Sequence, residues 1–369
     1  MPPRRAAVPA LALLALAAPR GAPAVEVVRI EVASGLAEAE LSGPGLEAEP
    51  LREGAAAARV EGGRARVRLD GDTLRLDGRP VEGAGLVFRA RGPIRHGRRD
   101  LSGEVEVRRG PGGLEVIDVL PLEDYVAAVT GAEMPPSFPA EALKAQAVAA
   151  RTFALARKLA AREGGLDADL GATVLDQVYP GAGADPRARA AAEATRGEVV
   201  VFERRAIEAY FHSACGGSTA TGEEALGRAF PYLRSVPCGQ CGAAPSHRWR
   251  VHVDGERMAA AAGFAGKATA ARVAARTGSG RVERVEVEAG GRRSSVTGAA
   301  LRKALGWDRV PSLAFTLQPS RGGFLLEGRG SGHGAGLCQW GAAGRARAGE
   351  GYRRILLHYY PGTEILKAY

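Results

Sequence analysis

The chain has 369 residues, 46% of them hydrophobic and 25% charged, which is ordinary for a folded protein and enough for more than one hydrophobic core. The formal net charge of +9 suits an anionic polymer or surface, but the arginines are spread along the chain without a dense basic block. Aromatic residues make up only 5%, too few for the base-stacking platform of a nucleic-acid-binding protein. We therefore expect no nucleic-acid partner.

The first 24 residues are typical of a signal peptide. Arg4 and Arg5 form a basic start, residues 6–18 are largely apolar, and Ala22-Pro23-Ala24 is a small-x-small cleavage site. No later segment reaches the roughly 18 consecutive apolar residues of a membrane span. We expect an exported protein, periplasmic or extracellular and associated with the cell wall, without a transmembrane segment in the mature chain. An uncleaved N-terminal anchor is the alternative.

Residues 25–116 alternate apolar and polar side chains with a period of two. Runs such as 28–32, 65–69 and 104–107 are separated by glycine-rich turns, among them Gly62-Gly63. This pattern predicts short, half-buried antiparallel strands. The range 25–116 is therefore expected to form a β-rich N-terminal module.

A glutamate precedes the most strongly helical segment of the chain. Pro135, Pro136 and Pro139 stiffen the stretch between Glu133 and a helix expected from Pro139 to about residue 162. A surface glutamate needs no such scaffold, so Glu133 is a candidate acid or base held at a helix entrance. A purely structural proline-rich loop is the alternative.

The expected helix carries small residues at positions 143, 147, 150 and 154, which predict its core-facing side. Lys144, Gln146 and Arg151 lie off or beside this stripe. They are candidates for groups that support Glu133, with solvent exposure or simple helix propensity as the alternative.

The remaining pattern predicts an α+β protein. A mixed α/β catalytic domain is expected over residues 117–248 and 311–369, and residues 249–310 are expected to form an inserted α/β subdomain. From Gly328 to Gly336 glycines alternate with single residues, and no Gly-Lys-Ser/Thr follows them. This spacing excludes a phosphate-binding loop and favours close backbone approach, either of another strand or of an extended polymer.

Six motifs occur in a fixed order between residues 133 and 362. They are Glu-Met-Pro (133–135), Asp-Gln-Val-Tyr-Pro-Gly (176–181), Tyr-Phe-His-Ser-x-Cys-Gly-Gly (210–217), Pro-Tyr-Leu-x-Ser-Val (231–236), Gly-His-Gly-x-Gly-x-x-Gln-Trp-Gly-Ala (332–342) and His-Tyr-Tyr-Pro-Gly (358–362). In this order they resemble the SpoIID/LytB family, from about residue 116 to 369. The resemblance implies an extracytoplasmic lytic transglycosylase that cleaves peptidoglycan glycan strands, in some members strands without stem peptides. It also implies Glu133 as the catalytic acid/base.

A lytic transglycosylase can work with one carboxyl group, whereas most glycosidases use two. The muramoyl C6 hydroxyl attacks its own anomeric carbon and forms a 1,6-anhydro ring, so one carboxyl first donates and then accepts a proton. Glu123 and Glu141 are the rivals for a second carboxylate, and Glu141 is expected to complement a helix N-terminus. A helix N-terminus lowers a carboxyl pKa, so Glu133 is expected to need burial to act as an acid.

Further polar residues are candidates for binding or supporting the glycan. Trp340 is expected to stack on a sugar ring, with a place in the core as the alternative. Ser213 beside His212 suggests a serine hydrolase, but no Gly-x-Ser-x-Gly elbow surrounds it. The candidate substrate-binding or supporting residues are Lys144, Gln146, Arg151, Asp176, Gln177, Ser213, His333, Gln339 and Trp340.

Four cysteines offer either a metal site or disulfides. His212-x2-Cys215 and Cys238-x2-Cys241 have the spacing of metal ligands, and Cys338 is a further candidate, so at most four of these five residues would hold a Zn²⁺. An exported chain with an even number of cysteines is also where disulfides form. Some SpoIID-like proteins bind zinc near the active site, which favours the metal. Many relatives have serine at two of these cysteine positions, 215 and 338, so the resemblance alone does not imply it.

Two functions are carried forward. The first is a lytic transglycosylase acting on peptidoglycan glycan strands. The second is a non-catalytic wall-binding protein that enhances a partner cell-wall amidase, a role that the name LytB implies. The intact Glu-Met-Pro loop at Glu133 favours the first, because a binding module has no need of it.

Overall fold

A computed structural model describes residues 25–51, 60–172 and 177–369. Mixed helices and several sheets confirm the predicted α+β class. The predicted signal peptide, residues 1–24, and the candidate Asp176 lie outside the described residues.

The N-terminal strands form two sheets around a shared hydrophobic cluster. The predicted period-two strands are present, and β4 (Arg64–Asp70) alternates exposed and buried side chains along most of its length. The first sheet has the order β12 (Leu170–Gly171), β1 (Val27–Leu36), β11 (Gly113–Pro121), β10 (Glu104–Gly110), β7 (Gly85–Arg89) and β3 (Glu47–Pro50). The second has the order β6 (Arg79–Val81), β5 (Thr73–Leu76), β4 (Arg64–Asp70), β2 (Glu38–Ser42), β8 (Ile94–His96) and β9 (Arg99–Leu101).

Helices and short strand pairs make up the central part of the molecule. The predicted stripe of small residues on α2 (Ala140–Glu163) is buried from Leu143 to Ala154, as expected for the core-facing side. The helices are α1 (Leu122–Glu133), α2 (Ala140–Glu163), α3 (Pro186–Ala194), α4 (Gly222–Leu226), α7 (Gln339–Arg347) and α8 (Tyr352–Tyr359). The strands are β13 (Glu198–Phe202) between β14 (Arg205–Ala206) and β23 (Glu364–Lys367), and the parallel pair β15 (Phe211–His212) and β22 (Leu337–Cys338).

A third unit has a core of its own, which includes Val253, Val285 and Leu326. One sheet holds β16 (Trp249–Asp254), β21 (Gly323–Gly328) and β20 (Phe315–Ser320). The other holds β17 (Ala268–Arg276), β18 (Val282–Ala289) and β19 (Arg292–Thr297), with α5 (Gly255–Ala261) and α6 (Gly298–Leu305) beside them. Because β20 and β21 pair in the same sheet as β16, we propose that the inserted unit spans 249–328 rather than ending at 310.

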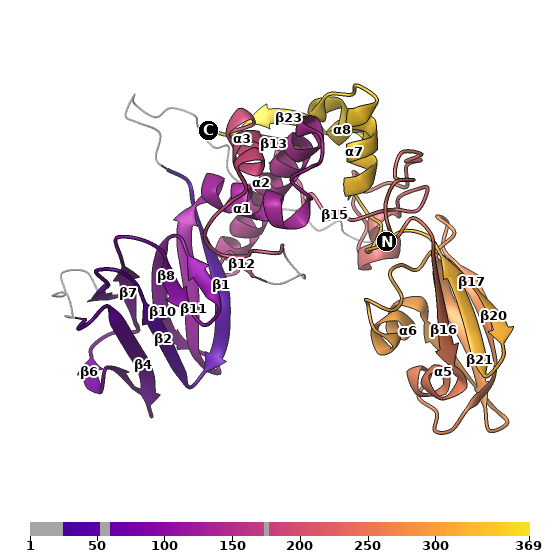
Figure 1. Cartoon of the computed structure of the whole chain (residues 1–369), viewed down its shortest axis with the longest axis horizontal. Coiled ribbons are helices and arrows are strands. Elements are labelled where there is room, and N and C mark those ends of the chain that lie inside the picture. The colour runs from indigo at the N-terminus through magenta and orange to yellow at the C-terminus, as the bar shows by residue number, and fades with distance from the viewer. Residues whose placement is uncertain (1–24, 52–59, 173–176) are drawn as a thin grey trace, which may run out of the picture.

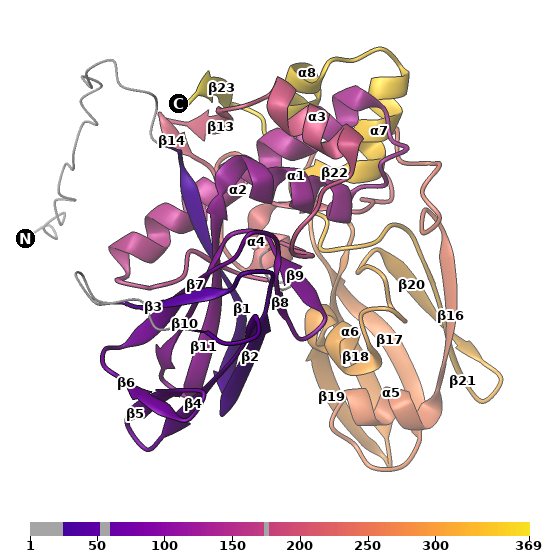
Figure 2. The same cartoon turned by 60° about the vertical axis from the view of Figure 1, so that its left-hand side comes forward.

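The two β-rich parts are separate lobes on the same side of the helices. Figures 1 and 2 show the N-terminal strands as one lobe and the 249–328 unit as the other, below α1, α2, α3, α7 and α8. The helical central part therefore connects the two β-rich lobes. The chain runs through this central part both before and after the inserted unit.

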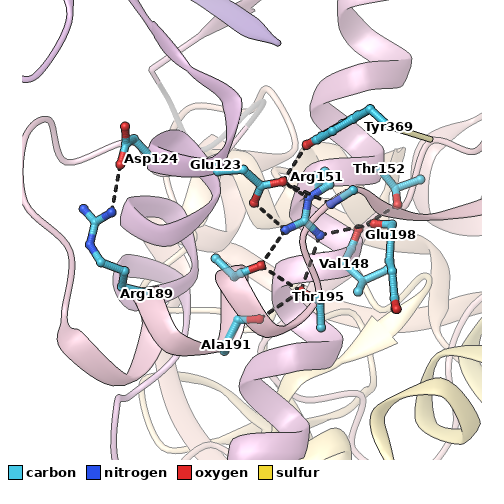
Figure 3. A network of polar contacts seen from close by, with 12 residues as sticks. Glu123, Asp124, Val148, Arg151, Thr152, Arg189, Ala191, Thr195, Glu198 and Tyr369 are labelled. Carbon is cyan, nitrogen blue, oxygen red and sulfur yellow. Dashed lines mark hydrogen bonds and ion pairs between the residues drawn. The ribbon is translucent and has the colours of Figure 1, made fainter. Parts of the chain in front are cut away.

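A buried ion pair fixes α1 against α2. Arg151 of α2 is 0% exposed and donates to both carboxylate oxygens of Glu123, at 2.9 Å from Nε and 2.6 Å from Nη2. Its guanidinium also donates to the carbonyls of Ala192 and Glu198, and the hydroxyl of the C-terminal Tyr369 donates to Glu123. Figure 3 shows these contacts converging from several elements. The candidate Arg151 is therefore a structural residue that holds the start of α1 in place.

Candidate active site

Glu133 is the last residue of α1, not a loop residue at the entrance of α2. Pro135 disfavours helical backbone at the residue before it, Met134, whose φ of −124° and ψ of 138° are extended. The helix α1 therefore ends at Glu133. The C-terminal end of a helix disfavours a negative charge. The expected conflict with a helix N-terminus therefore does not arise, and the position of Glu133 favours its protonated form.

Two donors face the carboxyl group of Glu133. The backbone N–H of Val178 donates to Oε1 at 2.9 Å, and Nε2 of Gln339 lies 3.5 Å from Oε2. Burial raises the pKa of Glu133 above its ordinary value, although both hydrogen bonds favour the ionised form. A half-buried carboxyl with a raised pKa and fixed orientation suits general acid catalysis.

The segment that carries the Val178 N–H is held on both sides. Oε1 of Gln177 accepts a hydrogen bond of 2.8 Å from Tyr125, and the hydroxyl of Tyr179 donates to Asp118 at 2.6 Å. The rings of Tyr125 and Tyr179 pack with centroids 5.5 Å apart. Gln177 therefore helps to order this segment through its bond with Tyr125. Asp118 and Tyr125 were missed, although a lone aspartate in the apolar run 116–120 was a usable signal.

Gln339 connects Glu133 to a second buried amide. Its Nε2 lies 3.4 Å from Oε1 of Gln146, a fully buried residue of α2 whose own Nε2 has no partner among the described residues. Gln339 is the first residue of α7 and follows Cys338, whose Sγ accepts the N–H of Gly341 at 3.3 Å as the N-cap. The sequence candidate Gln339 thus contacts Glu133, and the candidate Gln146 contacts Gln339.

The rival carboxylates are engaged elsewhere. Burial would raise the pKa of Glu123, but its ion pair with Arg151 and the hydrogen bonds from Tyr369 and the Gly197 N–H together keep this pKa below its ordinary value. Glu141 pairs with Lys144 at 2.7 Å and accepts the N–H of Tyr352, and these contacts outweigh desolvation and lower its pKa. Both groups are held ionised, so neither is suited to donate a proton. The candidate Lys144 therefore forms a surface ion pair with Glu141.

The four cysteine thiols form one buried group. The sulfurs of Cys215, Cys238, Cys241 and Cys338 all lie within 4.8 Å of one another, and all four are free thiols. The Sγ atoms of Cys215 and Cys241 are 3.7 Å apart, close to the roughly 3.8 Å edge of a tetrahedron with Zn–S bonds of about 2.3 Å. Backbone N–H groups of Cys215, Gly217 and Gly341 donate to these sulfurs. The donor set therefore fits a tetrahedral thiolate metal site.

The two candidate histidines are fixed by backbone groups. Nδ1 of His212 bonds the carbonyl of Ala335 at 3.0 Å, and His212 lies outside the group of four sulfurs. In His333, Nδ1 accepts the Ala335 N–H and Nε2 therefore donates to the Phe211 carbonyl at 2.8 Å. Burial lowers the pKa of His333 to about 4. His333 is thus neutral, and its hydrogen bonds hold the glycine-rich segment against Phe211 of β15.

The remaining candidates are placed near α7. The Trp340 ring packs edge-on against Phe138 with centroids 4.8 Å apart and is half-buried. The carbonyl of Ser213 accepts the backbone N–H of Trp340 at 3.0 Å, and among the described residues no hydrogen bond joins the Ser213 hydroxyl to a histidine. Trp340 therefore packs partly against the core, and Ser213 contributes through its backbone.

The alternating glycines allow another segment to approach closely. A Cβ on Gly336, which has φ +70°, would lie 2.0 Å from the Tyr210 carbonyl oxygen, and one on Gly330 would lie 2.4 Å from that of Ala214. This confirms the expected close approach of another strand, here the segment 210–218. The same contact brings Cys215 and Cys338 together.

These features define an α+β protein with one half-buried acid/base candidate beside a four-cysteine group. The SpoIID profile, described as stage II sporulation protein, matches residues 111–202, and a domain of unknown function, DUF8618, matches residues 243–336. The stage II sporulation protein D of Bacillus amyloliquefaciens is 31% identical over 271 residues, covering 68% of this chain and 76% of that protein. The chain belongs to the SpoIID family.

Two other relatives extend the comparison. An uncharacterized protein of Brachyspira hyodysenteriae is 36% identical over 255 residues, covering 68% of each chain. The amidase enhancer of Bacillus subtilis is 28% identical over 286 residues, covering 63% of this chain but only 39% of that protein. The likeness to the amidase enhancer is therefore to a part of a longer protein.

Among the described residues, no helix is both long and apolar enough to span a bilayer.

Proposed function

We propose that this protein is an exported lytic transglycosylase that cleaves the glycan strands of peptidoglycan and leaves 1,6-anhydro ends, with Glu133 as the single acid/base. The observation that carries the proposal is the environment of Glu133, because this carboxyl has a raised pKa and two fixed donors in a SpoIID-family chain. Export rests on residues 1–24, whose sequence is typical of a signal peptide.

One carboxyl can complete the reaction. Protonated Glu133 donates its proton to the bridging glycosidic oxygen as the bond from that oxygen to the muramoyl C1 breaks. The C6 hydroxyl oxygen of the same sugar then bonds to C1, and its proton passes to the Glu133 carboxylate. The carboxyl group ends in its starting, protonated state. The reaction therefore consumes no water and needs no second carboxylate. Glu123 and Glu141 are held ionised, which agrees with a mechanism that uses Glu133 alone.

The donors on Glu133 serve the second half of this cycle. After the first proton transfer the glutamate is negative, and the Val178 N–H and the Gln339 amide stabilise that charge. Burial and the helix end favour the neutral form again. The balance between these effects would let one group act first as acid and then as base.

We also propose that Cys215, Cys238, Cys241 and Cys338 hold one Zn²⁺ as a structural centre. Four thiolates in tetrahedral spacing are typical of structural zinc, which leaves no open position for substrate. When bound, zinc would cross-link the loop after β15, the 238–241 turn and the start of α7. Since Gln339 directly follows Cys338, the chain's own ligand set would hold the Gln339 amide against Glu133.

A second function stays open because one relative is named an amidase enhancer. In that case the chain would bind the glycan strand and activate a partner cell-wall amidase without cutting the strand itself. The fixed, pKa-shifted Glu133 favours the enzyme.

One experiment separates the two functions. Purified sacculi and glycan strands stripped of stem peptides are incubated with the protein, and the soluble products are analysed by mass spectrometry. An enzyme gives anhydromuramoyl ends, and comparison of the two substrates shows whether stem peptides are tolerated. An enhancer alone gives no new ends but increases peptide release when an amidase is added.

A further inference from the structure

Arg281 belongs to the inserted unit, but its side chain contacts the loop after β15 in the central part of the molecule. It lies between β17 and β18, and only 4% of it is exposed. Its Nη2 donates to the carbonyls of Cys215 at 3.2 Å and Ser218 at 3.0 Å, and its Nη1 donates to the Ser279 hydroxyl at 2.9 Å. The guanidinium therefore lies against the loop that carries the first thiol ligand.

The glycine-rich segment leaves room for this guanidinium. A Cβ on Gly334, which has φ +94°, would lie 2.6 Å from Nη2 of Arg281. A side chain there would push the guanidinium away from the Cys215 loop. The absence of a side chain at Gly334 thus fits the placement of a buried cation at this point.

No carboxylate pairs with Arg281 among the described residues. Its Nε has no hydrogen-bond partner, and the acid that acts on its charge, Glu224, instead accepts the backbone N–H groups of Ser279 and Thr221. A buried charge without a partner is strongly unfavourable. The observed burial of Arg281 therefore calls for another source of negative charge.

Metal-bound thiolates of the four-cysteine group would supply that charge. The guanidinium donates to the Cys215 carbonyl, and the N–H of the same residue lies 3.3 Å from the Cys338 sulfur. Four thiolates around one Zn²⁺ carry a net charge of −2, because four negative charges exceed two positive ones. A buried centre of this charge needs a nearby cation as much as Arg281 needs an anion.

We propose that Arg281 is the counter-cation of the tetrathiolate metal centre, so that the inserted unit 249–328 completes the centre and its docking is linked to metal binding. This rests on the zinc centre proposed above. By linkage, an occupied centre strengthens the contact of the inserted unit, and the docked unit raises metal affinity by the same factor. The inserted unit thereby gains a role in holding the site near Glu133.

The test measures zinc affinity in the full-length protein by competition with a chromophoric chelator. Arg281→Met removes the charge, Arg281→Lys keeps it, and Arg284→Met is the matched control, since Arg284 is exposed on β18. Loss of an outer partner typically weakens metal binding about 10–100-fold, so we expect a loss of at least about tenfold for Arg281→Met. Arg281→Lys should retain part of the affinity, and Arg284→Met all of it.

A second measurement needs no variant and covers the case in which Arg281→Met does not fold. Hydrogen exchange is followed in the wild-type chain with zinc and after removal of zinc by the chelator. Faster exchange in residues 277–285 after removal supports the linkage, and unchanged exchange there overturns it. Zinc affinity of Arg281→Met within about twofold of wild type also overturns it. A wild-type chain that takes up no zinc overturns the metal centre and this proposal together.

Discussion

The side-chain amide of Gln339 lies 3.5 Å from the carboxyl of Glu133, although 206 positions separate them in the chain. Gln339 begins α7 directly after Cys338, and Glu133 ends α1. The candidate acid/base and the four-thiol group therefore meet through two consecutive residues. This contact explains why a structural centre would matter for catalysis without touching the substrate.

Removing the Gln339 amide should change the titration of Glu133 as well as its rate. In Gln339→Met the carboxyl loses a donor that stabilises its ionised form, so its pKa rises further. We expect kcat to fall about tenfold and the alkaline limb of the kcat/KM profile to move to higher pH. Gln318→Met is the matched control, because Gln318 is exposed on β20. An unshifted alkaline limb would argue against the contact.

The stability of the protein should depend on the ionisation of Glu133. Because the folded-state pKa is raised, Glu133 favours the folded state at low pH and loses this contribution as pH rises through the folded-state pKa. Glu133→Gln cannot ionise, so we expect it to unfold at a higher temperature than wild type at about pH 7. The difference should shrink towards about pH 4, where the unfolded chain is also largely protonated. Thermal unfolding at both pH values decides this, and a constant difference would be the contrary outcome.

The Arg151–Glu123 pair should dominate the stability of the helical part. Arg151→Met leaves Glu123 buried without a partner, for which we expect a loss of about 3–5 kcal/mol in the free energy of unfolding. Arg189→Met removes the exposed pair with Asp124, drawn beside it in Figure 3, and should cost about 0–1 kcal/mol. Urea unfolding gives both values. Equal losses would mean that burial does not set the strength of these pairs.

The four cysteines should bind metal as a unit. We expect the natively purified protein to contain about one Zn²⁺ per chain, and Cys238→Ala or Cys241→Ala to abolish it. Zinc removal should also lower glycan cleavage, because the start of α7 is no longer held at Glu133. Elemental analysis and thiol counting after denaturation make the measurement. No zinc together with no titratable thiols would show two disulfides in place of the metal.

The sequence was sufficient for the strands and for α2, and it singled out Gln339, whose amide lies beside Glu133. The other donor to Glu133, the Val178 N–H, was not predicted. Periodicity predicted the strands and the buried stripe of α2, because both depend on local pattern. The sequence analysis placed Glu133 in a loop before α2, whereas it is the last residue of α1. The reason is that α1 begins at Leu122 and is ended by Pro135. The partners of Arg151 could not be predicted, since Glu123 and Tyr369 come from distant parts of the chain and meet only in the folded core.

The central claim, that Glu133 alone performs both proton transfers, is tested most directly by product analysis of one substitution. Peptide-free glycan strands are incubated with wild type, with Glu133→Gln and with Glu141→Gln, and anhydromuramoyl ends are counted by mass spectrometry. Glu141→Gln makes the same chemical change at an ionised surface carboxylate and should leave the product yield near that of wild type. Glu133→Gln should lower the rate by about 10²–10⁴-fold with glycan binding retained. Anhydromuramoyl ends formed by Glu133→Gln at near the wild-type rate would contradict the account.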